Sequence, residues 1–132
     1  MIAAGIGCRR GAAASEIEAA IRAALARANI AADALDVIAT IEGKSAETGI
    51  REAAEKLGVA VVIVPQRELA AAADRIETRS GRVLALTGVG SVAEAAALAA
   101  AGPSAKLISA RVATGSATCA LAASGPAPGG AR

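Results

Sequence analysis

The sequence contains no phenylalanine, tyrosine, tryptophan or histidine among its 132 residues. Without histidine, the chain has no Ser-His-Asp triad, no imidazole acid or base and no histidine ligand for a metal. Without aromatic rings, it has no platform on which nucleic-acid bases stack, which argues against single-strand and RNA-binding modules. The formal net charge of +2 is also too small to indicate nonspecific binding to DNA.

Cysteines are few, and long apolar runs are missing. Cys8 and Cys119 do not have CxxC spacing, which disfavours zinc and thioredoxin chemistry, and we expect free thiols in a reducing compartment. No uncharged run approaches the roughly 20 apolar residues of a membrane span, and an apolar start followed by arginines is the reverse of a signal peptide. We therefore expect a cytoplasmic protein that uses no metal or other cofactor and binds neither nucleic acid nor a membrane.

Alanine dominates the residues that are present. A core limited to Ile, Val, Leu and Ala predicts thin layers, in which helix and sheet backbones approach closely. The length suits one domain. We place that domain at residues 1–123, and we expect the Gly-, Pro- and Ala-rich residues 124–132 to form a flexible tail.

Strand-like and helix-like segments alternate along the chain. Strands are expected at residues 2–4, 37–41, 59–64, 82–86, 106–112 and 118–123, and helices at about 15–29, 45–57, 66–76 and 91–101. Two helix starts resemble capping boxes, Ser15 with Glu18 and Ser91 with Glu94. The β-branched run at 59–64 is typical of a strand that is buried on both faces.

This alternation predicts an α/β fold, a three-layer α/β/α sandwich with a mostly parallel mixed sheet. The last two strands are expected to form a C-terminal hairpin, whose final strand is antiparallel. Ligands of such sheets bind beyond the carboxyl ends of the strands. That rule gathers three loops on one edge, residues 5–11, 41–47 and 87–91.

The first loop, GIGCRRG, offers Gly5, Gly7, Cys8, Arg9 and Arg10 as ligand-binding residues. Guanidinium groups donate paired hydrogen bonds to carboxylate or phosphate. Adjacent arginines would lower the pKa of the Cys8 thiol, but no base is available, so a nucleophilic role for Cys8 is not favoured. The alternative is a tight turn with two solvated arginines. Cys119 is interpreted as a small core residue.

The second loop, IEGKSAE, contains Glu42, Lys44 and Glu47. A Lys44–Glu47 pair would position a polar ligand, and these two residues are the candidates for catalysis. Glu42 adds a second carboxylate. The alternative for Glu47 is that it complements the dipole of the following helix.

The third loop, TGVGSVAEAA, adds Thr87, Gly88, Val89, Gly90 and Ser91 as ligand-binding candidates. The pattern G-x-G-x-x-A lies between a strand and a helix, whose N-terminal N–H groups suit an anion. The acidic residue expected about 20 positions later is absent and Arg111 lies there, which leaves open an NADP-dependent reductase. A tight turn with a capping box would also explain every residue.

Four pieces together resemble the CobE family and the C-terminal domain of CbiG, both of cobalamin biosynthesis: GIGCRRG, IATIEGKSAETGI, TGVGSVAEAAAL and TCALA. The resemblance covers residues 2 to about 123 and implies an α/β/α sandwich with a role in corrin-ring assembly. CbiG-like proteins, the cobalt-precorrin-5A hydrolases, open a ring lactone and carry additional N-terminal regions. A stand-alone domain resembles CobE of the aerobic route, so enzyme and carrier or accessory protein both stay open. Glu42, where the family often has Asp, and Gly43 depart from the pattern.

The resemblance implies a precorrin or hydrogenobyrinic acid-type tetrapyrrole as the ligand, and other corrin-pathway enzymes as partners. Its acetate and propionate arms would bind Arg9, Arg10 and Lys44, while glycines let the macrocycle approach the backbone. Ser91 and its helix N-terminus would hold another carboxylate, and Glu47 would orient Lys44 or a reacting group. A third alternative is a non-catalytic adaptor that forms a homo-oligomer through its Ala-rich helices.

Overall fold

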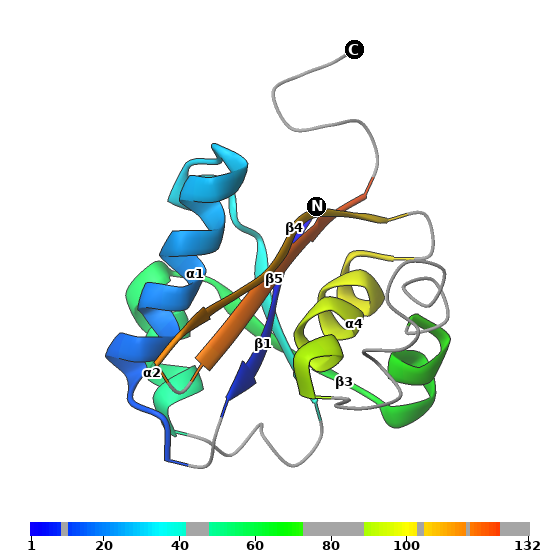
Figure 1. The fold of residues 1–132 in the computed structure, drawn as a ribbon, viewed down its shortest axis with the longest axis horizontal. Helices are drawn as coiled ribbons and strands as arrows, with labels where there is room; N and C mark the ends of the chain where they lie inside the picture. Colours follow the sequence, from blue (N-terminus) through cyan, green and yellow to red (C-terminus); the bar gives the residue numbers. More distant parts are fainter. Residues whose placement is uncertain (9–10, 42–47, 73–88, 103–104, 116, 125–132) are drawn as a thin grey trace.

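The computed structural model describes residues 1–8, 11–41, 48–72, 89–102, 105–115 and 117–124 (Figure 1). Its strands are β1 (Ile2–Cys8), β2 (Val37–Ile41), β3 (Ala60–Val64), β4 (Lys106–Thr114) and β5 (Ala117–Ala123). Its helices are α1 (Ala14–Ala28), α2 (Thr48–Leu57) and α4 (Val89–Ala101), with a short 3-10 helix, η1 (Ala32–Ala34). Residues 66–72 are also helical. No helix in this described part is long and apolar enough to cross a membrane.

The five strands form one mixed sheet in the order β3-β2-β1-β5-β4. β1, β2 and β3 are parallel, whereas β5 runs antiparallel to both β1 and β4. α1 and α2 cover one face of this sheet and α4 the other (Figure 1). The predicted α/β class, with a mixed sheet between helix layers and a C-terminal hairpin, is therefore confirmed. The strand predicted at 82–86 lies outside the described residues.

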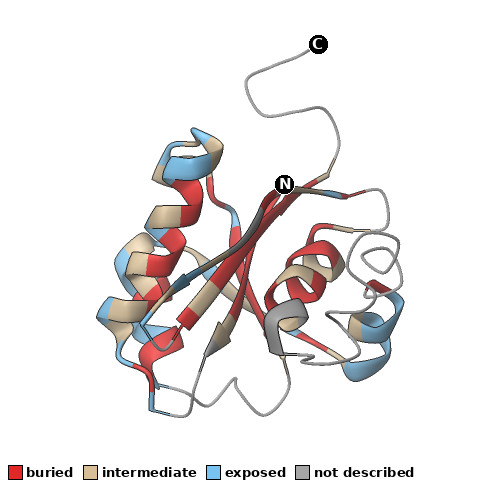
Figure 2. Ribbon diagram, viewed as in Figure 1, coloured by how far each residue is buried: buried red, intermediate tan, exposed pale blue. Residues whose placement is uncertain are grey.

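The two faces of the sheet carry side chains of different size. Strand residues alternate between faces. Ile2, Ile6 and Ile38 pack in the same cluster as Ile17 and Ile50 of α1 and α2. The residues between them, Ala3, Val37 and Ala39, pack with the alanines of α4. Figure 2 shows buried residues on the central strands and on the helices at both sides of the sheet.

The small residues on the α4 face allow an unusually close approach of helix and sheet. A Cβ built on Gly5 would overlap the carbonyl oxygen of Ala93 and lie 2.6 Å from the backbone nitrogen of Ala97. Both are backbone atoms of α4, so no side chain can rotate away to make room. The expectation of thin layers is confirmed at this position.

β1 is longer than predicted. The strand expected at residues 2–4 continues to Cys8, so Gly5 and Gly7 belong to a paired strand and the loop starts later than expected. Glycine usually weakens a strand, which is why the local pattern indicated a loop. Here the contact with α4 requires a residue without a Cβ.

The predicted capping box at Ser15 is wrong. α1 begins at Ala14, and its N-cap is Ala13, with φ −73° and ψ 146° and no side-chain cap. The Ala13 carbonyl accepts hydrogen bonds from the amides of Glu16 and Ile17. Glu18 instead pairs with Arg22 and Lys56, which leaves the first turn without a reciprocal cap.

The prediction that β3 is buried on both faces is also wrong. β3 lies at the edge of the described sheet, and Ile63 is 39% exposed. A run of β-branched residues is typical of a central strand but does not show which side chains a helix will cover. Other boundaries differ by one or two residues: β4 continues to Thr114, and β5 starts at Ala117.

Cys119 lies in the core, as predicted. It belongs to the cluster beneath α1 and α2, and its Sγ lies 3.7 Å from the carbonyl oxygen of Ala120. Burial raises the pKa of this thiol well above its ordinary value, because a thiolate would lose its hydration. Cys119 is therefore a protonated packing residue.

Candidate functional site

The ends of three elements meet at one edge of the sheet. β1 ends at Cys8, β2 ends at Ile41 and α4 begins at Val89. All three ends lie along the lower edge in Figure 1, which we call the carboxyl edge. Arg9 and Arg10 directly follow the first end, Glu42 follows the second, and Thr87 and Gly88 precede the third.

The end of β1 is held firmly by β5. Strand pairing continues up to Cys8 and Ala117. The hydroxyl of Thr118 also donates a hydrogen bond to the Gly7 carbonyl oxygen at 3.1 Å. Both arginines of the first predicted loop therefore leave a strand whose last residues are fixed on one side.

The first turn of α2 packs against the start of α1. A Cβ on Gly49 would overlap the carbonyl oxygen of Ala12 and lie 3.1 Å from Cδ1 of Ile17. The backbone that follows Arg9 and Arg10 and the backbone that follows Glu47 therefore touch. The first and second predicted loops are thus each followed by backbone that lies in the same contact, between Ala12 and Gly49.

The third segment reaches the edge through α4. Val89, Gly90 and Ser91 form the first residues of this helix, so Ser91 is the third helical residue and not its N-cap as predicted. The first-turn N–H groups of a helix have no partner within the helix, which keeps the anion-binding interpretation open. Ala93 packs on Gly5, and this close contact accounts for the small side chain at position 93. NADP binding stays a prediction.

All of the charged candidate residues, and two uncharged ones, lie outside the described part of the chain. These are Arg9, Arg10, Glu42, Lys44 and Glu47, together with Thr87 and Gly88. Their roles therefore stay predictions. Gly5 is buried beneath α4, and close packing accounts for a glycine at this position; its role in ligand binding stays a prediction.

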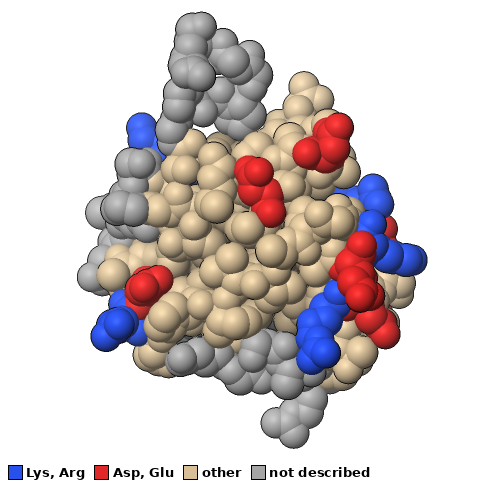
Figure 3. Space-filling view, turned by 180° about the vertical axis from the view of Figure 1, so that it is seen from behind, with Lys and Arg blue, Asp and Glu red and all other residues tan. Residues whose placement is uncertain are grey.

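Charges on the helices form local pairs. The Nε atom of Arg22 lies 2.8 Å from Oε2 of Glu18, and Nζ of Lys56 lies 3.8 Å from Oε1. The hydrogen bond from Arg22 is the main cause that lowers the pKa of Glu18. On the face shown in Figure 3, basic and acidic side chains are intermixed at the two sides, and further acidic side chains lie in the upper part. The described side chains seen there form no extended basic patch.

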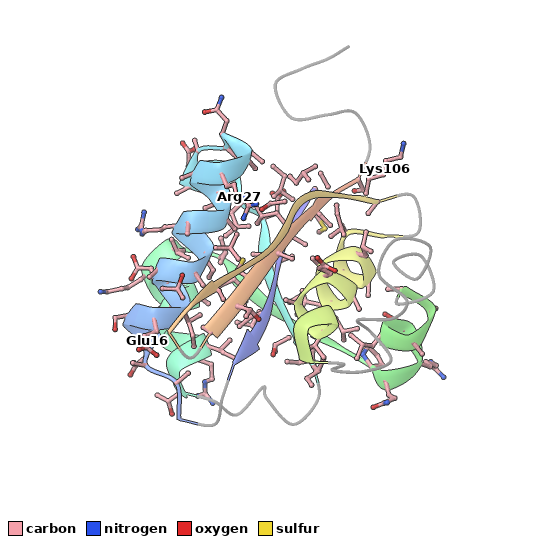
Figure 4. All side chains as sticks on the ribbon, viewed as in Figure 1. Glu16, Arg27 and Lys106 are labelled. Atoms are coloured by element: carbon pink, nitrogen blue, oxygen red, sulfur yellow. The ribbon has the colours of Figure 1, made fainter. Side chains whose placement is uncertain are left out.

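Three further charged residues lie at opposite edges of the sheet. Figure 4 shows Glu16 at the carboxyl edge and Arg27 and Lys106 near the opposite edge. The Glu16 carboxylate lies over the β4–β5 turn, 2.8 Å from where a Cβ of Gly115 would be. It therefore belongs to the hairpin side of the carboxyl edge.

The sequence analysis missed two residues near this edge, Thr40 and Ile63. Thr40 is completely buried, and within the described part of the chain its Oγ1 has no hydrogen-bond partner. Ile63 is the register partner of Thr40 on β3, and it is exposed. Neither has a local sequence signal, because threonine and isoleucine are ordinary strand residues.

No metal centre is apparent in the described residues, where no three His, Cys, Asp or Glu side chains come together.

Comparison with known proteins gives one consistent family. The sequence model of the family described as cobalamin synthesis G C-terminus matches residues 2–122 of the chain. The chain is 38% identical to protein CobE of a Sinorhizobium species over 93% of this chain and 79% of that protein. It is 36% identical to the cobalt-precorrin-5A hydrolase of Priestia megaterium over 74% of this chain but only 26% of the hydrolase. The crystal structure of cobalamin biosynthesis protein chiG from Agrobacterium tumefaciens superposes with a TM-score of 0.76, at 42% identity, over 96% of this chain and all of that one.

Proposed function

The chain belongs to the cobalamin synthesis G C-terminal family, and from this membership we propose that it is a cobalamin biosynthesis protein that binds a precorrin or related corrinoid at the carboxyl edge. The observation that carries the proposal is the meeting of three elements there. β1, β2 and α4 end or begin at the positions next to Arg9, Glu42 and Gly88. The predicted cations thus follow rigid elements that share one edge.

The chemistry of the ligand suits these residues. Precorrins carry several carboxylate arms around a flat ring, so they need separated positive groups on a rigid frame. Arg9 and Arg10 follow a strand that is paired to its last residue, and Lys44 belongs to the segment before α2. In this proposal each cation binds one arm, and the first-turn N–H groups of α4 receive another.

Whether ring chemistry follows binding depends on Lys44 and Glu47. A lysine can bind a carboxylate or transfer a proton, and a nearby glutamate can orient it. The chain spans about a quarter of the hydrolase it matches, so that activity is not transferred. The similarity to CobE over most of its length supports an assignment to the aerobic route, as a carrier or as an enzyme.

The proposal is tested by measuring the affinity for hydrogenobyrinic acid by equilibrium dialysis. The wild type is compared with the Arg9→Ala/Arg10→Ala variant. We expect the affinity to fall at least tenfold in the variant, because two charge-assisted contacts are lost.

The matched control removes two cations from the other edge, as Arg27→Ala/Lys106→Ala. Both double variants change the net charge equally, so nonspecific attraction would weaken binding in both to the same extent. Equal loss in the two variants, or undiminished affinity in Arg9→Ala/Arg10→Ala, would contradict the proposed site.

A further inference from the structure

Thr40 has a buried hydroxyl whose partner the described chain does not supply. The residue has no exposed surface, and its Oγ1 has no hydrogen-bond partner in the described part of the protein. A buried hydroxyl without a partner is unfavourable, and buried polar side chains in folded proteins are nearly always satisfied. Valine would fill the same volume without this cost, so the hydroxyl needs an explanation.

The direction of the Thr40 side chain follows from its neighbours on β2. Ile38 packs in the cluster that contains Ile50 and Ala53 of α2, whereas Ala39 packs with Ala96 of α4. Because side chains alternate along a strand, Thr40 points to the same face as Ile38, the face that α2 covers. It is the last β2 residue on this face before the carboxyl edge.

The first turn of α2 lies at the same edge and on the same face. Gly49 is packed against Ala12, beyond the end of β1. The first-turn N–H groups of this ten-residue helix have no partner within the helix, and they carry its positive dipole end. An unpartnered hydroxyl and a helix N-terminus therefore lie on one face of the same edge.

Ile63 adds an apolar wall. It pairs with Thr40 across the sheet, and register partners of neighbouring strands share a face. Within the described residues it and Met1 are the exposed large apolar side chains. An exposed isoleucine next to a buried, unpartnered hydroxyl suits a ligand group that has a short hydrocarbon stem and a polar end.

We propose that Thr40, Ile63 and the first turn of α2 form a subsite for one carboxylate-bearing arm of the tetrapyrrole, an inference that rests on the proposed function. The carboxylate accepts hydrogen bonds from the first-turn N–H groups of α2, and its methylene stem packs on Ile63. The Thr40 hydroxyl has no exposed surface in the ligand-free chain, so the ligand must displace the side chains that cover this hydroxyl before it can donate a hydrogen bond to the carboxylate. Thr40 is thus a positioning residue for the ligand.

The test compares Thr40→Val, which removes the hydroxyl but keeps the shape, with Thr40→Ser, which keeps the hydroxyl. Calorimetric titration with hydrogenobyrinic acid measures the affinity, and the same corrinoid with esterified carboxyls is the ligand control. We expect Thr40→Val to bind the acid about tenfold more weakly and Thr40→Ser to stay within about threefold of the wild type. Ile63→Ala is expected to weaken binding several-fold.

A second readout needs no ligand. If the hydroxyl has no partner in the ligand-free protein, Thr40→Val will keep or raise the thermal midpoint of unfolding. A lowered midpoint would mean that another part of the chain or a resident water satisfies the hydroxyl, and it would overturn the inference. Equal affinities of Thr40→Val and wild type for the acid would also overturn it, while leaving the proposed function intact. Wild type that fails to bind any carboxylate-bearing corrinoid would remove both proposals.

Discussion

At the residue scale, Gly5 decides how closely the two layers approach. Its missing Cβ leaves space for the backbone of α4 at Ala93 and Ala97. We predict that Gly5→Ala lowers the free energy of unfolding by about 3 kcal/mol or more, because a rigid backbone must shift. Urea unfolding followed by circular dichroism measures this. Gly58→Ala is the control, since its Cβ would meet open space and only the positive φ of 72° costs energy, about 1 kcal/mol. Equal costs for the two variants would contradict the close contact.

The buried thiol of Cys119 predicts a pH dependence of stability. Its pKa in the folded chain is raised above the ordinary value of 9.0 by burial. Above that pH the unfolded chain releases the thiol proton while the folded chain keeps it, so the unfolded state is favoured. The stabilising contribution is therefore complete below pH 9 and declines as the pH rises.

We expect the free energy of unfolding of the wild type to fall more steeply above pH 9 than that of Cys119→Ala. The excess slope approaches about 1.4 kcal/mol per pH unit for one thiol. Cavity formation in the variant shifts its stability at every pH, so the comparison uses the slopes alone. Parallel pH curves for the two proteins would mean that Cys119 ionises in the folded state.

At the element scale, α1 lacks a side-chain cap. Ala13 has the extended backbone of an N-cap residue, but alanine cannot accept a hydrogen bond from the first turn. We predict that Ala13→Asp raises the free energy of unfolding by about 1 kcal/mol, because it supplies both the acceptor and a charge that complements the dipole. Thermal unfolding at low and high salt measures both contributions. Ser15→Ala, at the position where the sequence pattern places the cap, is expected to change stability by less than about 0.5 kcal/mol. A larger loss of stability in Ser15→Ala would mean that Ser15 caps the helix as the sequence pattern predicts.

The elements also show which sequence signals were informative. The alternation of strand and helix patterns predicted the sheet and both helix layers, because hydrophobic periodicity follows directly from which face is buried. The local pattern placed Gly5 and Gly7 in a loop, although both belong to β1. The pattern could not show that Gly5 is needed for the contact with Ala93, because Ala93 lies far along the chain. Ser15 and Glu18 match a capping box, but the glutamate pairs with Arg22 and Lys56, the latter on another helix. Local patterns cannot report such tertiary partners.

At the scale of the whole molecule, the family and the shared edge of β1, β2 and α4 could be predicted from the sequence, whereas the complete burial of Thr40 could not. Four short segments carried the resemblance, and the family match over residues 2–122 confirms it. The rule for parallel sheets directed attention to the ends of β1 and β2. Thr40 could not be singled out, because its significance lies in complete burial without a partner, which only the folded chain reveals. The roles of Arg9, Arg10 and Lys44 stay predictions.

The most direct test of the account is a visible-absorbance titration of the wild-type protein with hydrogenobyrinic acid at low and at high salt. Binding of a polycarboxylate by arginine, lysine and helix N-termini is largely electrostatic, so we expect saturable binding of one corrinoid per chain that weakens as salt rises. The corrinoid with esterified carboxyls should bind at least tenfold more weakly at low salt. Absence of saturable binding, or equal affinity for the acid and the ester at both salt concentrations, would contradict the central claim that the carboxyl edge binds a tetrapyrrole through its carboxylates.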